Sequence, residues 1–218
     1  RKFDRKVSRT KNRPIASGKV SVVQGLFYSA FLCLIAFIVL IQFNFLTIFL
    51  AIGSMPLAFT YPLMKRYTYW PQLFLGITFN YGLILGWTAI TNEINVVPIV
   101  FYFGAIFWTL GFDTIYGFQD MIDDEIIGLK STSIKFKFYP YLFLKICYSI
   151  FLVSLIIIGF LLKLNLTYFL FLIIVVLQMY YFQIYKLDIK KTNSCLNIFK
   201  SNNFLGILVF TSLLAGKI

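Results

Sequence analysis

Acidic side chains are concentrated in one short stretch of this chain, DTIYGFQDMIDDE from Asp113 to Glu125, which holds five of its eight acidic residues. The chain as a whole is 60% hydrophobic. A carboxylate beside an apolar segment resists burial unless a cation, a hydrogen-bond donor or a substrate compensates its charge. The stretch therefore predicts a site that binds cations, carries protons or performs chemistry.

The acidic stretch continues an apolar run, 96–118, whose helical pattern is predicted to extend to about Asp124. Because a helix turns by about 100° per residue, Asp113, Asp120 and Asp124 would share one face. Asp113 would lie about 10 Å deeper than Asp120, since each residue rises about 1.5 Å. Asp120 and Asp124 would repel each other unless a cation lay between them. Gly117 on the same face would leave room for a ligand.

A solvated loop whose acids cap a helix is the ordinary alternative for such a run. For Asp123 and Glu125 this alternative is as good as a role in a site. Asp113 is different, because it is embedded between Trp108 and Tyr116 and needs a cation, a donor or a substrate as its partner. Spacing alone thus predicts an acidic, cation-binding helix end.

Long apolar segments must position these side chains. A mean hydropathy of +0.83 with only 13% charged residues excludes a soluble globular domain. Segments of about 20 apolar residues span a bilayer. We expect seven of them, the last being the shortest: 20–42, 45–64, 71–90, 96–117, 140–162, 166–186 and 203–217. The predicted fold class is all-α, a polytopic transmembrane helical bundle that forms one domain over residues 1–218.

The net charge of +12 is explained by where the basic residues lie. With seven crossings, 18 of the 20 Lys and Arg residues fall on the side that holds the acidic cluster, and only Lys163 and Lys217 fall on the other. Basic residues accumulate on the cytoplasmic side of membrane proteins. We therefore expect residue 1 and the acidic cluster to face the cytoplasm, and we expect membrane lipid but no nucleic acid as a partner.

Cysteine and histidine usage narrows the choice of metal. Cys33, Cys147 and Cys195 have no metal-binding spacing, and the chain has no histidine. Imidazole catalysis and His-ligated zinc are thereby excluded. Oxygen-ligated hard cations such as Mg²⁺ remain the plausible metals.

The acidic stretch belongs to a longer string, DTxYxxxDxxDDxxIGxKST, from Asp113 to Thr132. This string resembles the second acidic motif of the UbiA-type aromatic prenyltransferases, nearest to the branch that acts on 4-hydroxybenzoate. The opening RKFDRKVSRTKNRPIASG resembles the tail of the family's first acidic motif, NDxxDxxxD, and the basic loop that follows it. In that match Asp4 is the final aspartate and Arg13 lies in the loop. Tyr61 and Lys65 match a YxxxK element of the family.

The resemblance covers essentially the whole chain and implies an incomplete family domain. Family members have nine membrane helices, of which about seven are expected here. We therefore expect residues 1–218 to be a single membrane prenyltransferase domain that lacks its first two helices and most of the first acidic motif. Activity of the 218 residues alone is accordingly in doubt.

The family's activity is the Mg²⁺-dependent transfer of a polyprenyl group from polyprenyl diphosphate to the ring of 4-hydroxybenzoate, an early step of ubiquinone biosynthesis. By this resemblance Asp113 would accept the phenol proton and Arg66 would be the basic residue needed for activity. The remaining roles are diphosphate binding by Tyr61, Lys65 and Arg13, and metal binding by Asp4, Asp120 and Asp124. The membrane would be the bacterial inner membrane, or the mitochondrial inner membrane in a eukaryote, with the site at the cytoplasmic or matrix face.

Two other functions remain open. A prenyltransferase of the same superfamily with another acceptor, such as a naphthoate or a haem, would have similar acidic motifs. A cation-binding membrane transporter would place charges or broken helices near the bilayer midplane in two related halves. The acids here concentrate at one interface and no repeat is visible, which favours the prenyltransferase.

Overall fold

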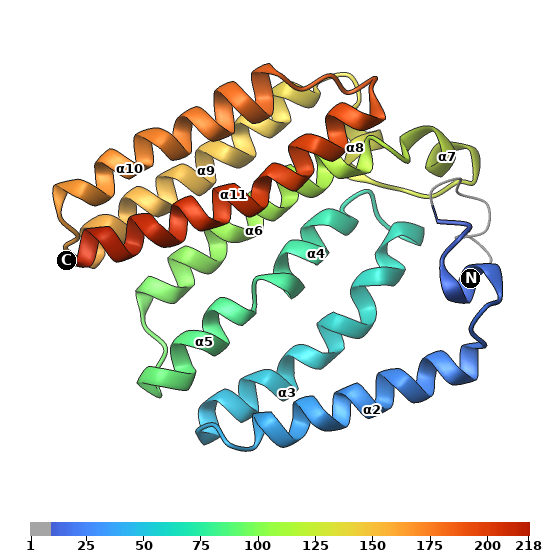
Figure 1. The fold of residues 1–218 in the computed structure, drawn as a ribbon, viewed down its shortest axis with the longest axis horizontal. Helices are drawn as coiled ribbons and strands as arrows, with labels where there is room; N and C mark the ends of the chain where they lie inside the picture. Colours follow the sequence, from blue (N-terminus) through green and yellow to red (C-terminus); the bar gives the residue numbers. More distant parts are fainter. Residues whose placement is uncertain (1–9) are drawn as a thin grey trace.

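Helices joined by short turns make up the part of the chain that the computed structural model describes, residues 10–218 (Figure 1). The helices, in chain order, are α1 Pro14–Ser17, α2 Val22–Leu40, α3 Phe45–Thr60 with its 3₁₀ continuation η1 Tyr61–Arg66, α4 Pro71–Phe79, α5 Gly82–Thr91, α6 Val96–Gly117, α7 Met121–Ile126, α8 Thr132–Lys135, α9 Pro140–Leu161, α10 Leu166–Val176 with its π-helical continuation η2 Leu177–Tyr185, and α11 Thr192–Lys217.

Seven helices among residues 10–218 are long and apolar enough to cross a membrane. This confirms the predicted all-α class and the predicted number of spans. The last helix begins at Thr192, whereas the sequence predicts a start near residue 203, so the predicted start of this span is wrong. Its first turns carry Asn193, Asn197 and Asn202, whose low helix propensity conceals the helix in the sequence.

Three of the spans change geometry partway, among them α10, which continues as the π-helix η2. A break at Asn80 separates α4 from α5, and the Asn80 side-chain amide donates hydrogen bonds to the Ala105 carbonyl (3.1 Å) and the Thr109 hydroxyl (2.7 Å). These bonds tie the break to α6. In the span before it, Pro62 lies at the start of η1, where a proline without an N–H is tolerated. The tighter 3₁₀ winding then carries the chain to Arg66.

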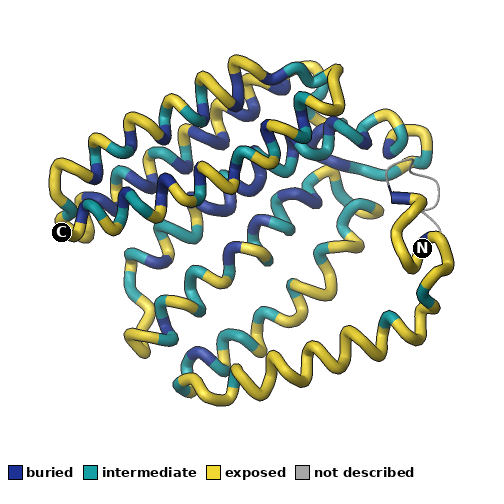
Figure 2. The backbone as a smooth tube through the Cα atoms, viewed as in Figure 1, coloured by how far each residue is buried: buried dark blue, intermediate teal, exposed yellow. Residues whose placement is uncertain are grey.

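The packed core lies among α6, α9, α10 and α11 (Figure 2). Helices α6 and α9 approach closely because Gly104 faces Ser154 and Gly111 faces the Tyr148 ring, so that a β-carbon at either glycine would overlap its neighbour. Small residues commonly allow such close approach between membrane helices. By contrast, α2 has no buried residue and is exposed along its length. The packed half of the molecule therefore includes α6, the helix that leads to the acidic stretch.

Candidate active site

The acidic stretch lies on two helices and not on one. Helix α6 ends at Gly117, a turn follows, and Asp120 is the N-cap residue of α7. The backbone N–H of Asp120 bonds to the carbonyl of Gly117 (3.2 Å), which closes the turn tightly. The predicted continuous helix to Asp124 is therefore wrong, and Asp113 and Asp120 lie on two elements joined by this turn. One element of the prediction survives: the Asp124 N–H bonds to the Asp120 carbonyl (2.8 Å), so these two remain one turn apart.

Both carboxylates predicted to bind metal from this stretch are buried. Asp120 is 5% exposed and Asp124 is 2% exposed. Asp124 forms an ion pair with Lys65, whose Nζ lies 3.0 Å from its Oδ2. The Lys65 side chain is 40% exposed, so water reaches the ion pair from the Lys65 side and is excluded from the Asp124 side. The Lys65 ammonium group, in η1, thus contacts the acidic stretch directly through Asp124.

Tyr61, Lys65 and Asp113 line one small cavity of about 150 Å³. The resemblance groups Tyr61 with Lys65 in one YxxxK element, and the structure adds Asp113 from α6. Gln72, near the start of α4, also lines the cavity. Sequence reasoning missed Gln72, although a glutamine directly after Pro71 in an otherwise apolar helix is a recognisable signal. The arrangement brings a phenol, a cation, an amide and a carboxylate around one space.

Thr132, at the end of the acidic motif, and the adjacent Ser133 pack against the residues that support this cavity. The Gln72 side-chain oxygen accepts a hydrogen bond from the Thr132 N–H (3.0 Å), and the Thr132 and Thr114 hydroxyls are 2.6 Å apart. Ser133 donates to the Thr114 carbonyl (3.0 Å). Thr114, Thr132 and Ser133 are all fully buried. These hydroxyls therefore hold the chain after α7 against α4 and α6.

Gly117 has a different role from the predicted one. A β-carbon there would overlap the Ser133 hydroxyl and come within 3.2 Å of the Gln72 side-chain nitrogen. The space beside Gly117 is therefore filled by α8 and is not open to a ligand. Gly128 has φ +73°, in the left-handed region that favours glycine, and it turns the chain between α7 and α8.

The other predicted site residues lie apart from the cavity. Arg66 is the exposed last residue of η1 and is not part of the cavity wall. Arg13 is the exposed N-cap residue of α1, which Figure 1 draws at the same end of the molecule as α7. Both arginines take part in interactions with other groups of the chain. Asp4 lies outside the described residues.

Whether a metal ion fits at Asp120 and Asp124 depends on which other ligands complete its coordination. Within residues 10–218, no three acidic or cysteine side chains form a group that would surround a metal by themselves. Mg²⁺ in proteins is usually held by one or two carboxylates together with phosphate oxygens and water. Asp120 and Asp124, one turn apart and buried, match that requirement. The donor set fits a magnesium ion shared with a phosphate-bearing ligand.

A larger aromatic cavity of about 550 Å³ lies between α6 and α11. Trp108, Phe112 and Phe199 are among its lining residues. The Trp108 indole donates to the Asn202 side chain (2.8 Å), which also accepts from Gln183 (3.1 Å). Asn202 is thus a packing residue inside α11. The cavity can hold an apolar chain or an aromatic ring.

Comparison with known proteins gives consistent matches over the whole chain. The sequence profile of the UbiA prenyltransferase family matches residues 1–208. The chain is 42% identical to 4-hydroxybenzoate geranyltransferase 2 of Lithospermum erythrorhizon, over 100% of this chain and 71% of that protein. It is 41% identical to the mitochondrial 4-hydroxybenzoate polyprenyltransferase of Homo sapiens, over 99% of this chain and 58% of that protein.

The fold also matches a solved structure. An apo structure of a UbiA homolog from Aeropyrum pernix K1 superposes with a TM-score of 0.83 at 21% sequence identity, covering 100% of this chain and 81% of that one. A similarity at this identity shows that the two chains share a fold.

Proposed function

The chain belongs to the UbiA prenyltransferase family, and from this premise we propose that it transfers a polyprenyl group from polyprenyl diphosphate to the ring of 4-hydroxybenzoate. The observation that carries the proposal is the cavity that joins Lys65 and Asp113, with Asp124 paired to Lys65 on its edge. A diphosphate donor requires a cation that binds its leaving group, and a phenolic acceptor requires a base. Lys65 and Asp113 offer these two groups within one cavity. The names of the relatives support the same acceptor.

Lys65 is proposed to bind the donor diphosphate. Its ammonium group is half-exposed and already paired with one oxyanion, Asp124, at 3.0 Å. A diphosphate carries several such oxygens and can take over part of this pairing. Tyr61, on the same cavity wall, is placed to donate its hydroxyl to a phosphate oxygen. Arg66 and Arg13 are proposed to add positive charge from outside the cavity.

Asp120 and Asp124 are proposed to hold Mg²⁺ together with the diphosphate, and Asp4 is proposed as the ligand from the other motif. When bound, the metal would neutralise the charge that grows on the leaving pyrophosphate. Burial of both carboxylates strengthens their attraction for a divalent cation, because little water screens them. Lys65 would keep the Asp124 carboxylate oriented before the donor arrives.

Asp113 is proposed as the base for the acceptor. The bond between the prenyl carbon and the diphosphate oxygen breaks, and its electron pair leaves with pyrophosphate. The ring carbon beside the phenol oxygen then forms the new carbon–carbon bond, while Asp113 takes the phenol proton. The ring C–H proton then leaves to water, which restores aromaticity as a phenolate, and the proton held by Asp113 returns to the oxygen to give the phenol. Asp113 lies half-buried on the long helix α6, which packs against α9 and suits a base that must hold one position.

The aromatic cavity is proposed to receive the apolar part of the donor. Trp108 and Phe112 on α6 and Phe199 on α11 offer apolar walls, and aromatic faces stabilise nearby positive charge. Excluding water from the allylic cation prevents its hydrolysis. In the cell the product would feed ubiquinone biosynthesis. The proposed location is the bacterial inner membrane, or the mitochondrial inner membrane in a eukaryote, with the site at the cytoplasmic or matrix face.

The test is a membrane assay with radiolabelled 4-hydroxybenzoate and prenyl diphosphates of two to ten isoprene units, with Mg²⁺ or with a chelator. It is run on the 218 residues and on the same chain preceded by the N-terminal segment of the longer human relative. We expect prenylated product only with Mg²⁺. A naphthoate acceptor is assayed in parallel. Prenylation of the naphthoate in preference to 4-hydroxybenzoate would replace the proposed acceptor.

A matched pair of variants separates the site from ordinary surface acids. Asp120→Asn should abolish turnover, because it removes a buried ligand charge from the diphosphate clamp. Glu125→Gln should leave most of the activity, since Glu125 is exposed and pairs with Lys137 at 2.6 Å. If both variants kept full activity, the acidic stretch would be only a solvated face.

A further inference from the structure

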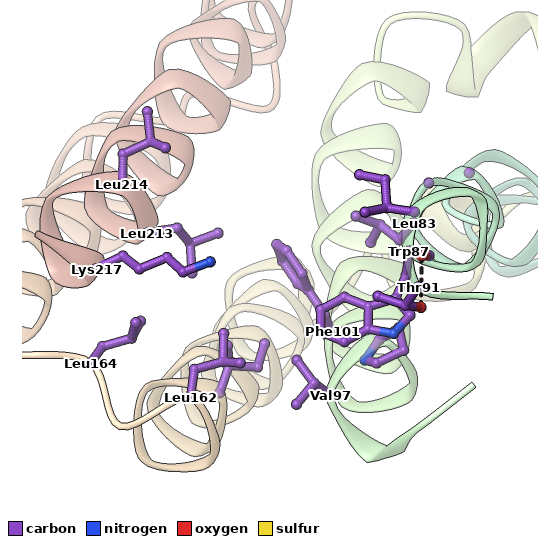
Figure 3. A pocket seen from close by; sticks show the side chains of 15 residues that line it. Leu83, Trp87, Thr91, Val97, Phe101, Leu162, Leu164, Leu213, Leu214 and Lys217 are labelled. Atoms are coloured by element: carbon purple, nitrogen blue, oxygen red, sulfur yellow. Dashed lines mark hydrogen bonds between the residues drawn. The ribbon is translucent and has the colours of Figure 1, made fainter. Parts of the chain in front are cut away.

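A second large cavity lies at the end of the bundle opposite the acidic stretch. The last turn of α5, the first turn of α6, the end of α9 and the end of α11 meet there, whereas α7 lies beyond the far end of α6. The cavity has a volume of about 600 Å³. Residues from all four helices line it (Figure 3). None of the proposed site residues belongs to its wall.

The walls of this cavity are apolar, and two glycines widen it. Leu162, Leu213 and Phe101 are among the side chains that form its surface. Gly82 and Gly86 lie one turn apart on α5, and a β-carbon at either would meet no atom within 4 Å. The slot along α5 is therefore open space into which a hydrocarbon chain can fit.

Two polar groups stand out on these apolar walls. Lys217 extends from α11 across the cavity toward Phe101 and Trp87 (Figure 3). Within residues 10–218, its ammonium group makes no ion pair. The indole N–H of Trp87 is buried and has no hydrogen-bond acceptor among the described residues. A buried donor without a partner is rare in folded proteins and calls for an explanation such as an absent ligand.

We propose that this cavity binds an anionic phospholipid from the leaflet opposite the acidic stretch. One acyl chain lies in the slot beside Gly82 and Gly86, and the phosphate pairs with the ammonium group of Lys217. A glycerol-ester oxygen accepts the hydrogen bond of the Trp87 indole. Each part of the lipid thus meets a group of matching chemistry: hydrocarbon against apolar walls, anion against cation, and acceptor against the unpaired donor.

Other occupants use only part of the cavity. A prenyl chain would fill the apolar slot but has no anion for Lys217 and no acceptor for Trp87. Inorganic phosphate would pair with Lys217 and leave the apolar walls in contact with water. A lipid with an anionic head satisfies both features, because its chain fills the apolar slot and its phosphate meets Lys217.

The test compares phosphatidylglycerol with phosphatidylcholine of the same acyl chains. The purified chain is delipidated in detergent and mixed with equal amounts of the two lipids, and native mass spectrometry measures which stays bound. We expect about a fivefold preference for phosphatidylglycerol, the contribution typical of one well-placed cation. Lys217→Gln should abolish the preference. Lys163→Gln is the matched control, because Lys163 lies at the same end but does not line the cavity.

A second pair of variants tests the slot. A β-carbon at Gly86 meets no atom, so Gly86→Leu places its side chain in the slot and should reduce retention of both lipids at least tenfold. Gly53→Leu is the control, because a β-carbon at Gly53 also meets no atom and Gly53 lies on α3, away from the cavity. The melting temperature of each variant in detergent confirms folding, and Lys217→Gln remains informative if Gly86→Leu does not fold.

Three results would overturn the proposal. Equal loss of selectivity in Lys163→Gln and Lys217→Gln would mean that lipids respond to general surface charge. Displacement of phosphatidylglycerol by inorganic phosphate at equal concentration would mean a phosphate site without a chain. Displacement by a long prenyl alcohol, with wild-type affinity in Lys217→Gln, would assign the slot to a neutral hydrocarbon. These readouts measure binding alone, so they stand whether or not the chain prenylates 4-hydroxybenzoate.

Discussion

The Lys65 ammonium nitrogen lies 3.0 Å from a carboxylate oxygen of Asp124, and this contact joins the end of η1 to α7. The two residues are 59 positions apart in the chain. A backbone bond from the Lys130 N–H to the Lys65 carbonyl (2.8 Å) lies beside it. The chain after α7 is therefore fastened to η1 through both the backbone and the side chain of Lys65.

The position of the Lys65 side chain, on the cavity wall and paired with Asp124, predicts how its loss affects the kinetics of prenyl transfer. Lys65→Ala should raise the KM for the prenyl diphosphate about tenfold or more, with a smaller fall in kcat. The diphosphate meets the ammonium charge in both the ground state and the transition state, so binding suffers most. Steady-state kinetics with varied donor measures the effect.

Lys130→Ala is the matched control. Its ammonium group donates to the Tyr67 carbonyl (3.3 Å) and lies over the Tyr69 ring (5.5 Å to the centroid), and Lys130 does not line the cavity. The backbone bond to Lys65 is kept in this variant. If Lys130→Ala raised the KM for the donor as much as Lys65→Ala, the effect would come from the general positive charge of this face.

Asp113→Asn should act on the chemical step. The amide keeps the size of the side chain but cannot take the phenol proton, so kcat should fall at least a hundredfold while donor affinity survives. Single-turnover prenylation and donor binding, measured separately, distinguish the two effects. A loss of donor affinity as severe as that in Asp120→Asn would move Asp113 into the metal site.

The sequence predicts the membrane spans well because hydropathy depends on composition over about 20 residues. All seven spans occur among residues 10–218. Tyr61 and Lys65, which the family's YxxxK element groups together, also line one cavity. Their spacing alone does not explain this, because in the 3₁₀ winding of η1 residues i and i+3 align and residues i and i+4 do not.

Features that depend on distant contacts could not be predicted in this way. Nothing in the periodicity of 96–124 marks the end of α6 at Gly117, because that end is stabilised by Ser133 and Gln72, which come from other helices. The role of Gln72 is likewise decided by its contact with Thr132, 60 residues away. Only the folded arrangement shows that hydroxyl groups, and not a ligand, fill the space beside Gly117.

The packing at Gly117 predicts a structural rather than a catalytic defect in a variant. Gly117→Ala places a methyl group against the Ser133 hydroxyl and should destabilise the protein by about 1–3 kcal/mol, the usual cost of overpacking. Thermal unfolding in detergent measures this. Gly53→Ala, where the added methyl meets no atom, is the control and should unfold at nearly the wild-type temperature. Equal melting temperatures of the two variants would show that α8 is not packed on α6.

The uneven distribution of basic residues predicts the orientation in the membrane. A membrane-impermeant maleimide added to intact cells should label Glu93→Cys, in the turn between α5 and α6, and should not label Lys137→Cys. Both are made in a Cys33→Ser background, because Cys33 is exposed while Cys147 and Cys195 are buried. Permeabilising the cells should make Lys137→Cys reactive, which shows that the side chain is accessible once the reagent reaches it. Labelling of Lys137→Cys but not Glu93→Cys in intact cells would invert the topology and place the acidic stretch outside.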